Sequence, residues 1–287
     1  MNILVTGAHG QLGSCLSEWQ QQHEQASYRF FFTDVEELDI TDRQAIERYV
    51  SEKNINIIIN AAAYTNVDKA ETEPEKALLL NATAVHYLAE IAQAKGLFLV
   101  HISTDYVFDG QASTPYPIDA PVCPLSVYGK TKAAGEKAVM DSGAHTVIIR
   151  TSWLYSVYGN NFVKTMLRLG SERPEIRVVS DQIGSPTSAH DLAEAIMQLI
   201  ENKNIKEKQI LLHYSNAGTI SWYDFACAIM QFGKRNTHVI PITTAEYPTL
   251  APRPSWSVMD LSLTQELYPI EIKDWKESLA RVVQTLL

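Results

Sequence analysis

Cysteine is scarce in this chain of 287 residues, which contains three: Cys15, Cys123 and Cys227. They are widely separated and form no CxxC pair. A disulfide framework is built from several closely spaced cysteines, and structural zinc sites commonly use paired CxxC motifs. The spacing therefore favours a reducing compartment and argues against a disulfide-stabilised fold or a zinc centre.

Long hydrophobic runs are missing as well. No apolar stretch approaches the roughly 20 residues that a membrane-spanning helix needs. The strand-like residues 2–5 follow the first methionine directly, which leaves no room for a secretory signal peptide. We therefore expect a cytoplasmic protein with no membrane partner.

Positive charge is the third shortage, because 24 lysines and arginines face 33 aspartates and glutamates, which gives a net charge of −9. A negative surface repels the phosphates of nucleic acids, so we expect no nucleic-acid partner. The hydrophobic share of 46% is ordinary for a globular protein. The length allows one large domain or two closely joined ones.

The first 150 residues alternate between two patterns. Apolar β-rich runs at 3–6, 28–33, 55–60, 97–103 and 146–151 are separated by helical patterns at 12–22, 42–53, 74–95 and about 125–141. Strands that alternate with helices predict βαβ units with right-handed crossovers. We therefore predict an α/β fold with a Rossmann-type doubly wound parallel sheet, in which residues 1–150 bind NAD(P).

The second half is less regular. Strand patterns at 176–180 and 210–214 alternate with helical patterns at 189–200, 223–231 and 275–287, and loops with prolines at 241, 248, 252 and 254 interrupt them. We interpret residues 151–287 as mainly a smaller α/β substrate-binding domain, interleaved with the last elements of the Rossmann sheet. Such a domain would lie against the strand ends, where open α/β sheets bind ligands.

A glycine-rich loop joins the first predicted strand to the first predicted helix, where Gly7, Gly10 and Gly13 form a GxxGxxG motif. Glycines permit a tight turn and the close approach of a pyrophosphate, which the N-terminus of the helix attracts. Asp34 follows the second strand, where a carboxylate accepts hydrogen bonds from an adenosine ribose. Because this carboxylate repels a 2′-phosphate and no arginine follows closely, NADH is favoured over NADPH.

Two tyrosines precede a lysine by four residues, Tyr49 with Lys53 and Tyr128 with Lys132. The first pair lies in the helix after the second strand, on the adenosine side, and is interpreted as a solvated helix face. The second pair follows the strand that ends at Thr104. Residues four apart on a helix share one face, so Tyr128 and Lys132 can point to the same cleft as Thr104.

These three residues suit the reduction of a carbonyl group. Hydride transfer to the carbonyl carbon builds negative charge on the oxygen, and Tyr128 would donate a proton to it. A free phenol has a pKa of about 10, and we expect the Lys132 ammonium to lower that pKa. Lys132 would also hold the nicotinamide ribose, and the Thr104 hydroxyl would position the carbonyl oxygen.

Further motifs make the likeness to a known family specific. They are T-G-A-H-G-Q-L-G, A-A-A-Y-T-N-V-D-K-A-E, S-T-D-Y-V-F-D-G, Y-G-K-T-K-A-A-G-E, R-T-S-W-L-Y, D-Q-I-G-S-P-T and R-P-S-W-S-V-M-D. Together they resemble the extended short-chain dehydrogenase/reductases and, within them, the dTDP-4-dehydrorhamnose reductase family. The resemblance runs from residue 4 to about residue 262.

The resemblance implies reduction of dTDP-4-dehydro-β-L-rhamnose to dTDP-β-L-rhamnose with NADH or NADPH. It also implies roles for particular residues: Gly10, Gln11 and Leu12 at the cofactor phosphates; Asp34, Asp39 and Ile40 at the adenosine; Ala63, Tyr64 and Thr65 along the cofactor channel; and Thr104, Asp105, Trp153 and Arg253 at the nucleotide sugar. Core packing is the alternative for Trp153, and a solvated loop position is the alternative for Arg253.

One position departs from the family pattern. Some members carry a glutamate just after the glycine loop that helps to bind Mg²⁺ at a dimer interface, whereas this chain has Ser14-Cys15-Leu16. His190 and Asp191 alone would not supply the several oxygens that a hard cation needs. We therefore expect no metal, and both a monomer and a homodimer remain open.

Other reactions and a non-catalytic role compete with this interpretation. A sugar-nucleotide 4,6-dehydratase needs an acid/base pair after the threonine, but Tyr106 follows Asp105 here. A 4-ketoreductase or epimerase for another sugar nucleotide remains open. A regulatory subunit of the methionine adenosyltransferase type also remains open, although the intact Thr104, Tyr128 and Lys132 favour catalysis.

Overall fold

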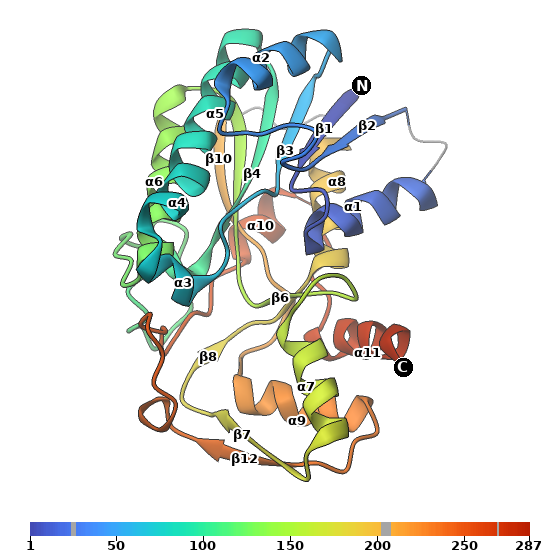
Figure 1. Ribbon diagram of the computed structural model, residues 1–287, viewed down its shortest axis with the longest axis vertical. Coiled ribbons are helices and arrows are strands. Elements are labelled where there is room, and N and C mark those ends of the chain that lie inside the picture. The colour runs from blue at the N-terminus through green and yellow to red at the C-terminus, as the bar shows by residue number, and fades with distance from the viewer. Residues whose placement is uncertain (24–26, 202–207, 269) are drawn as a thin grey trace.

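The computed structural model describes residues 1–23, 27–201, 208–268 and 270–287. Six parallel strands form the central sheet in the order β10-β5-β4-β3-β1-β2 (Figure 1). They are β1 (Asn2–Thr6), β2 (Arg29–Thr33), β3 (Ile57–Asn60), β4 (Phe98–Thr104), β5 (His145–Thr151) and β10 (Gln209–His213). The predicted Rossmann-type parallel sheet is confirmed.

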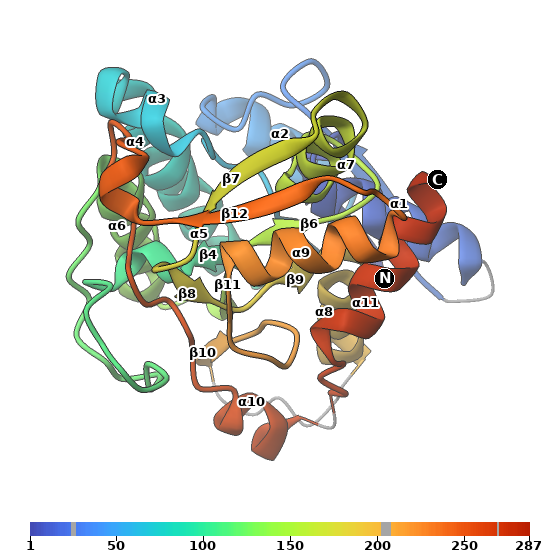
Figure 2. The same cartoon turned by 90° about the horizontal axis from the view of Figure 1, so that it is seen from below.

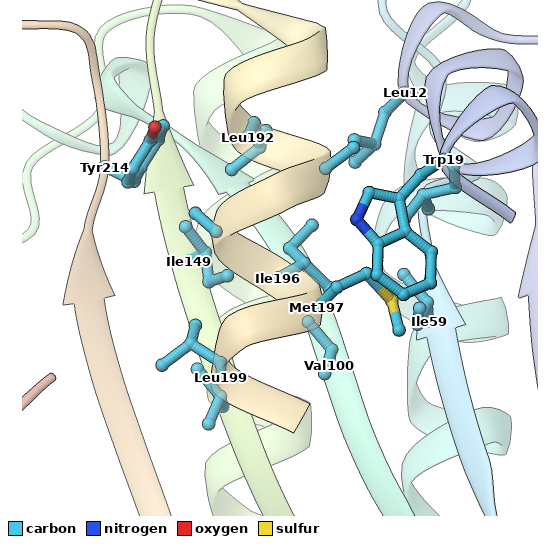
Figure 3. Packing of buried hydrophobic residues seen from close by; sticks show 14 of the residues in the cluster. Leu12, Trp19, Ile59, Val100, Ile149, Leu192, Ile196, Met197, Leu199 and Tyr214 are labelled. Atoms are coloured by element: carbon cyan, nitrogen blue, oxygen red, sulfur yellow. The ribbon is translucent and has the colours of Figure 1, made fainter. Parts of the chain in front are cut away.

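Helices cover both faces of this sheet, as expected for strands that are apolar on both faces (Figure 1). One face packs against α1 (Gln11–Gln22) and α8 (Ala189–Glu201), and the other against α2 (Arg43–Glu52), α5 (Ala84–Lys95) and α6 (Val127–Ser142). Figure 3 shows Leu192 and Ile196 of α8 beside Ile149 and Val100 of the sheet. The second half of the chain therefore supplies part of the sheet's core.

The long helix predicted over 74–95 is divided in the structure. After α3 (Val67–Thr72), α4 (Pro74–Leu78) leads through a π-helical turn, η1 (Leu79–Thr83), into α5. This turn carries Asn81, which is fully buried. The Asn81 side chain accepts the Tyr64 N–H at 2.8 Å and donates to the Thr131 hydroxyl at 3.1 Å. Since a π turn inserts an extra residue into a helix, it allows this amide to link the loop after β3 to α6.

The remaining elements form a smaller lobe at the carboxyl ends of the strands (Figures 1 and 2). Its apolar core is made by α7 (Phe162–Glu172), α9 (Trp222–Phe232), α11 (Trp275–Leu286) and the strand pair β7 (Glu175–Val179) and β12 (His238–Ile242). Two short pairings add β6 (Leu154–Tyr155) with β9 (Thr187–Ser188) and β8 (Ile183–Gly184) with β11 (Ile220–Ser221). The other elements are the turns η2 (Asp105–Val107) and η3 (Thr244–Glu246) and the helix α10 (Ser262–Leu267).

Strand β12 corrects one sequence-based interpretation. The prolines predict a loop around Pro241, but this segment is a strand that pairs in parallel with β7. The two strands form a sheet of their own, so Pro241 lies in an edge strand. Proline is tolerated there because one side of an edge strand needs no ladder hydrogen bonds.

The topology predicts a ligand crevice at the carboxyl ends of β1 and β3. From β1 the chain runs to β2 on one side and then to β3 on the other, so the direction of winding switches between β1 and β3. Open α/β sheets bind ligands at the carboxyl ends of the strands at such a point. Over the ranges that the structure describes, no helix has both the length and the apolar character needed to cross a bilayer.

Candidate active site

A cleft of about 860 Å³ runs along the carboxyl ends of the strands and reaches the smaller lobe. Most of the predicted site residues line it: Gly7, Gly10, Gln11, Leu12, Asp34, Asp39, Ile40, Ala63, Thr65, Thr104, Asp105, Tyr128, Lys132 and Trp153. Three of them, Gly13, Tyr64 and Arg253, are not in its lining. The fold therefore brings together residues that the sequence spreads over almost 150 positions.

The glycine loop suits the binding of a pyrophosphate. Gly7 has a left-handed φ of +71°, and a Cβ there would lie 2.7 Å from the Ala62 nitrogen. A Cβ at Gly13 would approach the Gly7 carbonyl oxygen to 2.4 Å, so Gly13 serves the close packing of α1 against the loop. Gly10 is the N-cap of α1 and has no side chain to occupy the N–H groups of the first turn. Those groups can therefore serve an anion.

The loop after β2 forms an acidic wall. The Asp34 Oδ2 accepts the His9 N–H at 3.1 Å, and the His9 Nδ1 lies 3.7 Å from the same oxygen. Asp39 and Ile40 line the cleft from the same loop. This wall has the acceptors that ribose hydroxyls need.

The segment after β3 contributes small side chains to the cleft. Ala63 and Thr65 line it, whereas the Tyr64 hydroxyl donates to the Glu73 Oε2 at 2.9 Å. The Asn81 amide fixes the backbone on this segment, because it also donates to the Tyr64 carbonyl at 3.0 Å. Tyr64 thus supports the wall of the channel but does not line it.

The residues predicted to be catalytic lie together in the cleft. Thr104 ends β4, and Ser126 caps the first turn of α6, the helix that carries Tyr128 and Lys132. Lys132 is buried, and its Nζ donates to the Ile102 carbonyl at 2.6 Å. The lysine is therefore held against β4, next to the strand end that supplies the threonine.

Burial governs the protonation of the tyrosine and the lysine. It lowers the pKa of Lys132 from 10.5 to about 8 and raises the pKa of Tyr128 above 10. The Thr104 hydroxyl lowers the pKa of Tyr128, but it is the smaller influence. The expectation that Lys132 makes this pKa low is not met here, because the loss of water around the phenol is the larger influence. Tyr128 therefore stays protonated at neutral pH, as a proton donor must.

A buried carboxyl group lies beside these residues. Asp105 is 2% exposed, and its Oδ1 accepts the Thr104 hydroxyl at 2.9 Å. Burial raises the pKa of Asp105 from 3.8 to about 6, although the hydroxyls of Thr104 and Ser257 oppose the rise. The cleft thus contains an acid that changes charge just below neutral pH.

A buried ion pair fixes α6 to the sheet behind the cleft. Arg150 on β5 donates to both carboxylate oxygens of Glu136, at 2.9 and 2.7 Å. The Ser103 hydroxyl donates to the same carboxylate at 2.5 Å. Glu136 lies one helical turn after Lys132, and a bidentate pair of this kind has a defined geometry. The pair therefore sets the position at which α6 presents Lys132 to the cleft.

Trp153 belongs both to the core of the smaller lobe and to the cleft wall. Its indole stacks on Trp222 with ring centroids 3.7 Å apart and an interplanar angle of 10°. Both rings line the cleft. A Cβ at Gly184 would come within 2.5 Å of the Trp153 ring, so this glycine makes room for it. Trp222 has no functional signal in the sequence, because its link to Trp153 arises only from the tertiary fold.

The family to which the chain is related follows from direct comparison. A family model described as the RmlD substrate binding domain matches residues 1–287. The chain belongs to this family.

Individual RmlD relatives agree with that assignment. A dTDP-4-dehydrorhamnose reductase of Aggregatibacter actinomycetemcomitans is 42% identical over 98% of this chain and 97% of its own length. The crystal structure of a Clostridium acetobutylicum dTDP-4-dehydrorhamnose reductase has 42% identity and a TM-score of 0.93, and covers 100% of this chain and 99% of its own. A Bacillus anthracis dTDP-4-dehydrorhamnose reductase, solved in complex with NADP, has 40% identity and a TM-score of 0.92 over 99% of both chains. The resemblance inferred from the motifs is confirmed.

Gln11 of this RmlD-family chain ties the glycine loop to the smaller lobe. Its Nε2 donates to the Leu154 carbonyl at 3.2 Å, and its Oε1 accepts from the Ser156 hydroxyl at 3.0 Å and from the Asn161 amide at 2.9 Å. A residue assigned to the cofactor phosphates therefore also joins the two lobes at one end of the cleft. This linking role gives no signal in the sequence.

Arg253 is neither solvated nor free in this RmlD-family chain. Its side chain is 18% exposed, and its Nη2 donates to the Asp68 Oδ2 at 2.5 Å. Asp68 lies on α3 in the larger lobe, so this ion pair joins two segments that are far apart in sequence. The alternative of a solvated loop arginine does not describe it.

The described part of this RmlD-family chain contains no cluster that could hold a metal ion, where a cluster means three or more histidine, cysteine, aspartate or glutamate side chains. Near the expected departure from the family pattern, His190 lies 2.9 Å from Glu18 through its Nε2. The absence of a bound metal stays a prediction.

Proposed function

We propose that this RmlD-family chain reduces the 4-keto group of dTDP-4-dehydro-β-L-rhamnose to give dTDP-β-L-rhamnose, the last step in the synthesis of that nucleotide sugar. The observation that carries the proposal is the cleft in which Thr104, Tyr128 and Lys132 lie beside a GxxGxxG loop. Relatives over the full chain that are named for this activity support it.

A nicotinamide cofactor fits the residues that line the cleft. Gly10, Gln11 and Leu12 would hold its pyrophosphate at the N-terminus of α1, and Asp34 would accept the adenosine ribose hydroxyls. Ala63 and Thr65 would line the channel between these ends. When bound, the reduced cofactor supplies the hydride.

The side chains of the chain supply the proton and hold the reacting oxygen. Tyr128 donates its hydroxyl proton to the 4-keto oxygen as the new C–H bond forms at the carbon, so that an alcohol results. Thr104, whose hydroxyl donates to the Asp105 Oδ1 in this structure, would turn that proton to the same oxygen. The Lys132 ammonium stabilises the phenolate that remains and holds the nicotinamide ribose. Solvent then returns a proton to Tyr128.

The nucleotide sugar would lie between these groups and the smaller lobe. Trp153, supported by Trp222, offers an apolar wall for the sugar ring, and Asp105 lies where a sugar hydroxyl could meet it. Arg253 would pair with the diphosphate.

The finer properties belong to the same proposal. Asp34 favours NADH over NADPH, because its charge repels a 2′-phosphate. We propose that the enzyme needs no Mg²⁺, acts in the cytoplasm and works as a monomer or homodimer. The division into a cofactor domain of residues 1–150 and a mainly substrate-binding domain of residues 151–287 also remains a prediction.

The decisive test is a coupled assay in which dTDP-4-dehydro-β-L-rhamnose is generated in the same reaction. The protein is added with NADH or with NADPH, the loss of reduced nicotinamide is followed, and the sugar product is identified. Formation of dTDP-L-rhamnose is the expected result, with the higher kcat/KM for NADH. A folded protein that binds NADH but consumes neither cofactor contradicts the proposal and favours another sugar nucleotide or a regulatory subunit.

A further inference from the structure

The short helix α3 begins at the wall of the cleft. Val67, its first residue, lines the cleft, and the Asn66 side chain caps the helix by accepting the Lys69 N–H at 2.9 Å. Asp68 and Glu71 follow at a spacing of three residues, which places two carboxylates on neighbouring positions of the helix surface. Asp68 contacts the loop that carries Arg253, and Glu71 contacts the start of α6.

Asp68 holds the loop that carries Arg253. Its Oδ1 accepts the Ala251 N–H at 3.0 Å, and its Oδ2 accepts the Arg253 Nη2 at 2.5 Å. The other terminal nitrogen of the guanidinium, Nη1, is buried and makes no well-formed hydrogen bond among the described residues, although the guanidinium is close enough to the Tyr106 hydroxyl to act as a hydrogen-bond donor to it. A buried donor without a partner is costly, and a planar guanidinium suits two-point binding of phosphate oxygens. Asp68 therefore orients Arg253 through one nitrogen, and the other faces Tyr106, where a ligand oxygen would offer it a stronger acceptor than a neutral phenol.

The held guanidinium is close to the lining of the cleft. Burial raises the pKa of Tyr106 to about 12, although the charge of Arg253 and a hydrogen bond from its guanidinium oppose the rise. Tyr106 lines the cleft and packs edge-on against Tyr128, with ring centroids 5.5 Å apart. Arg253 therefore lies one side chain away from the proposed proton donor.

Glu71 contacts the start of the helix that carries the proposed proton donor. Its Oε1 accepts the Val127 N–H at 2.8 Å. Val127 is the first residue of α6 and Tyr128 is the second. The N-terminal N–H groups of a helix otherwise lack partners, and a carboxylate there also complements the helix dipole. Glu71 therefore fixes the turn of backbone from which Tyr128 extends.

We propose that Asp68 and Glu71 are positioning residues with separate tasks, in which Asp68 sets Arg253 for the diphosphate of the nucleotide sugar and Glu71 sets Tyr128 for proton transfer. The inference rests on the proposed function, because it takes a nucleoside diphosphate sugar as the substrate. It predicts that substitutions at two residues of one short helix alter different kinetic constants.

The test at Asp68 uses Asp68→Asn, which keeps an acceptor for the Ala251 N–H and removes the charge that holds Arg253. The KM for the nucleotide sugar should rise about tenfold while kcat stays within about twofold. Titration calorimetry separates this role from general support of the fold. Asp68→Asn should weaken dTDP binding about tenfold and dTMP binding by less than about threefold, because the second phosphate is the group that Arg253 would meet.

The test at Glu71 compares Glu71→Ala with Glu71→Gln. The alanine removes the acceptor for the Val127 N–H, and kcat should fall about tenfold with KM within about twofold. The glutamine keeps an amide oxygen at the same place and should restore most of kcat. Glu75→Gln, at an exposed position on α4, is the matched control and should leave both constants unchanged.

The outcomes separate this inference from the proposed function. If the unaltered protein neither reduces the sugar nor binds dTDP, the proposed function fails. If it does both, but Asp68→Asn changes kcat and KM equally or weakens dTDP and dTMP equally, the role assigned to Asp68 is overturned. If Glu71→Gln is as impaired as Glu71→Ala, or Glu71→Ala changes KM alone, the role assigned to Glu71 is overturned. Thermal unfolding of each variant shows that the comparison is made on folded protein.

Discussion

Replacement of Asp105 by asparagine should make stability less dependent on pH. The native carboxyl is 2% exposed and has a pKa of about 6, whereas an aspartate in an unfolded chain has a pKa of about 3.9. Between these values the native state binds more protons than the unfolded state, so the free energy of unfolding decreases as pH rises through the window. A difference of about two pKa units corresponds to about 3 kcal/mol, all of which is lost above pH 6.

Asparagine has nearly the same shape and no charge, so Asp105→Asn removes the contribution of this carboxyl to the pH dependence of the free energy of unfolding. Because the unfolded aspartate is already half ionised at pH 4, the free energy of unfolding of the variant, relative to the unaltered protein, should be about 2 kcal/mol more favourable at pH 7 than at pH 4. Urea unfolding at several pH values between 4 and 7 measures it. The exposed Asp119 supplies the control Asp119→Asn. A relative stability that is the same at pH 4 and pH 7, or that changes with the opposite sign, would refute the reasoning.

Three further predictions concern the proposed catalytic and cleft residues. Tyr128→Phe should lower kcat about a thousandfold, since it removes the general acid, and a fluorescence titration should show unchanged NADH binding. Because the pKa of Lys132 is about 8, its ammonium is lost above that pH, and kcat/KM for NADH should fall there in the unaltered protein. In Lys132→Met, kcat/KM for NADH should be low at every pH and should not fall further above pH 8. If the same fall persists in this variant, a group other than Lys132 causes it. Trp222→Ala removes the ring stacked on Trp153 and should lower stability by about 2 kcal/mol and raise KM for the nucleotide sugar, as denaturant unfolding and steady-state kinetics would show. A normal KM would contradict the role of the Trp153–Trp222 stack in binding the sugar.

The parallel sheet could be predicted because each of its strands is a short apolar run between helical patterns. The run at 97–103 corresponds to β4, Phe98–Thr104, and the run at 146–151 to β5, His145–Thr151. Secondary structure is harder to predict where a single residue type, such as proline, disfavours the element that the apolar pattern predicts. Pro241 suggested a loop, but an edge strand tolerates it. Helix α7 has a cap at Asn161 and apolar residues at helical spacing, so its local signal is present even in the less regular half.

The candidate site was predictable where a motif encodes it and unpredictable where packing creates it. The spacing of Tyr128 and Lys132 and the position of Thr104 at a strand end are visible in sequence, because the helix and strand periods fix which side chains share a face. The effect of burial on the pKa of Tyr128 depends on the surrounding fold, so a two-residue argument from charge gave the wrong direction. The contact of Asp68 with Arg253 likewise has no local signal.

The edge strand β10 has a consequence for the order in which the protein can fold during synthesis. It pairs with β5, yet all of α7, β7 and α8 precede it in the chain. A nascent chain that ends after β5 would leave that strand unpaired on one side and would lack α8 over the apolar face that contains Val147 and Ile149. The larger lobe therefore cannot be completed until much of the smaller lobe has left the ribosome. Exchange of either lobe as a genetic module would break the sheet, so the two lobes must be inherited together.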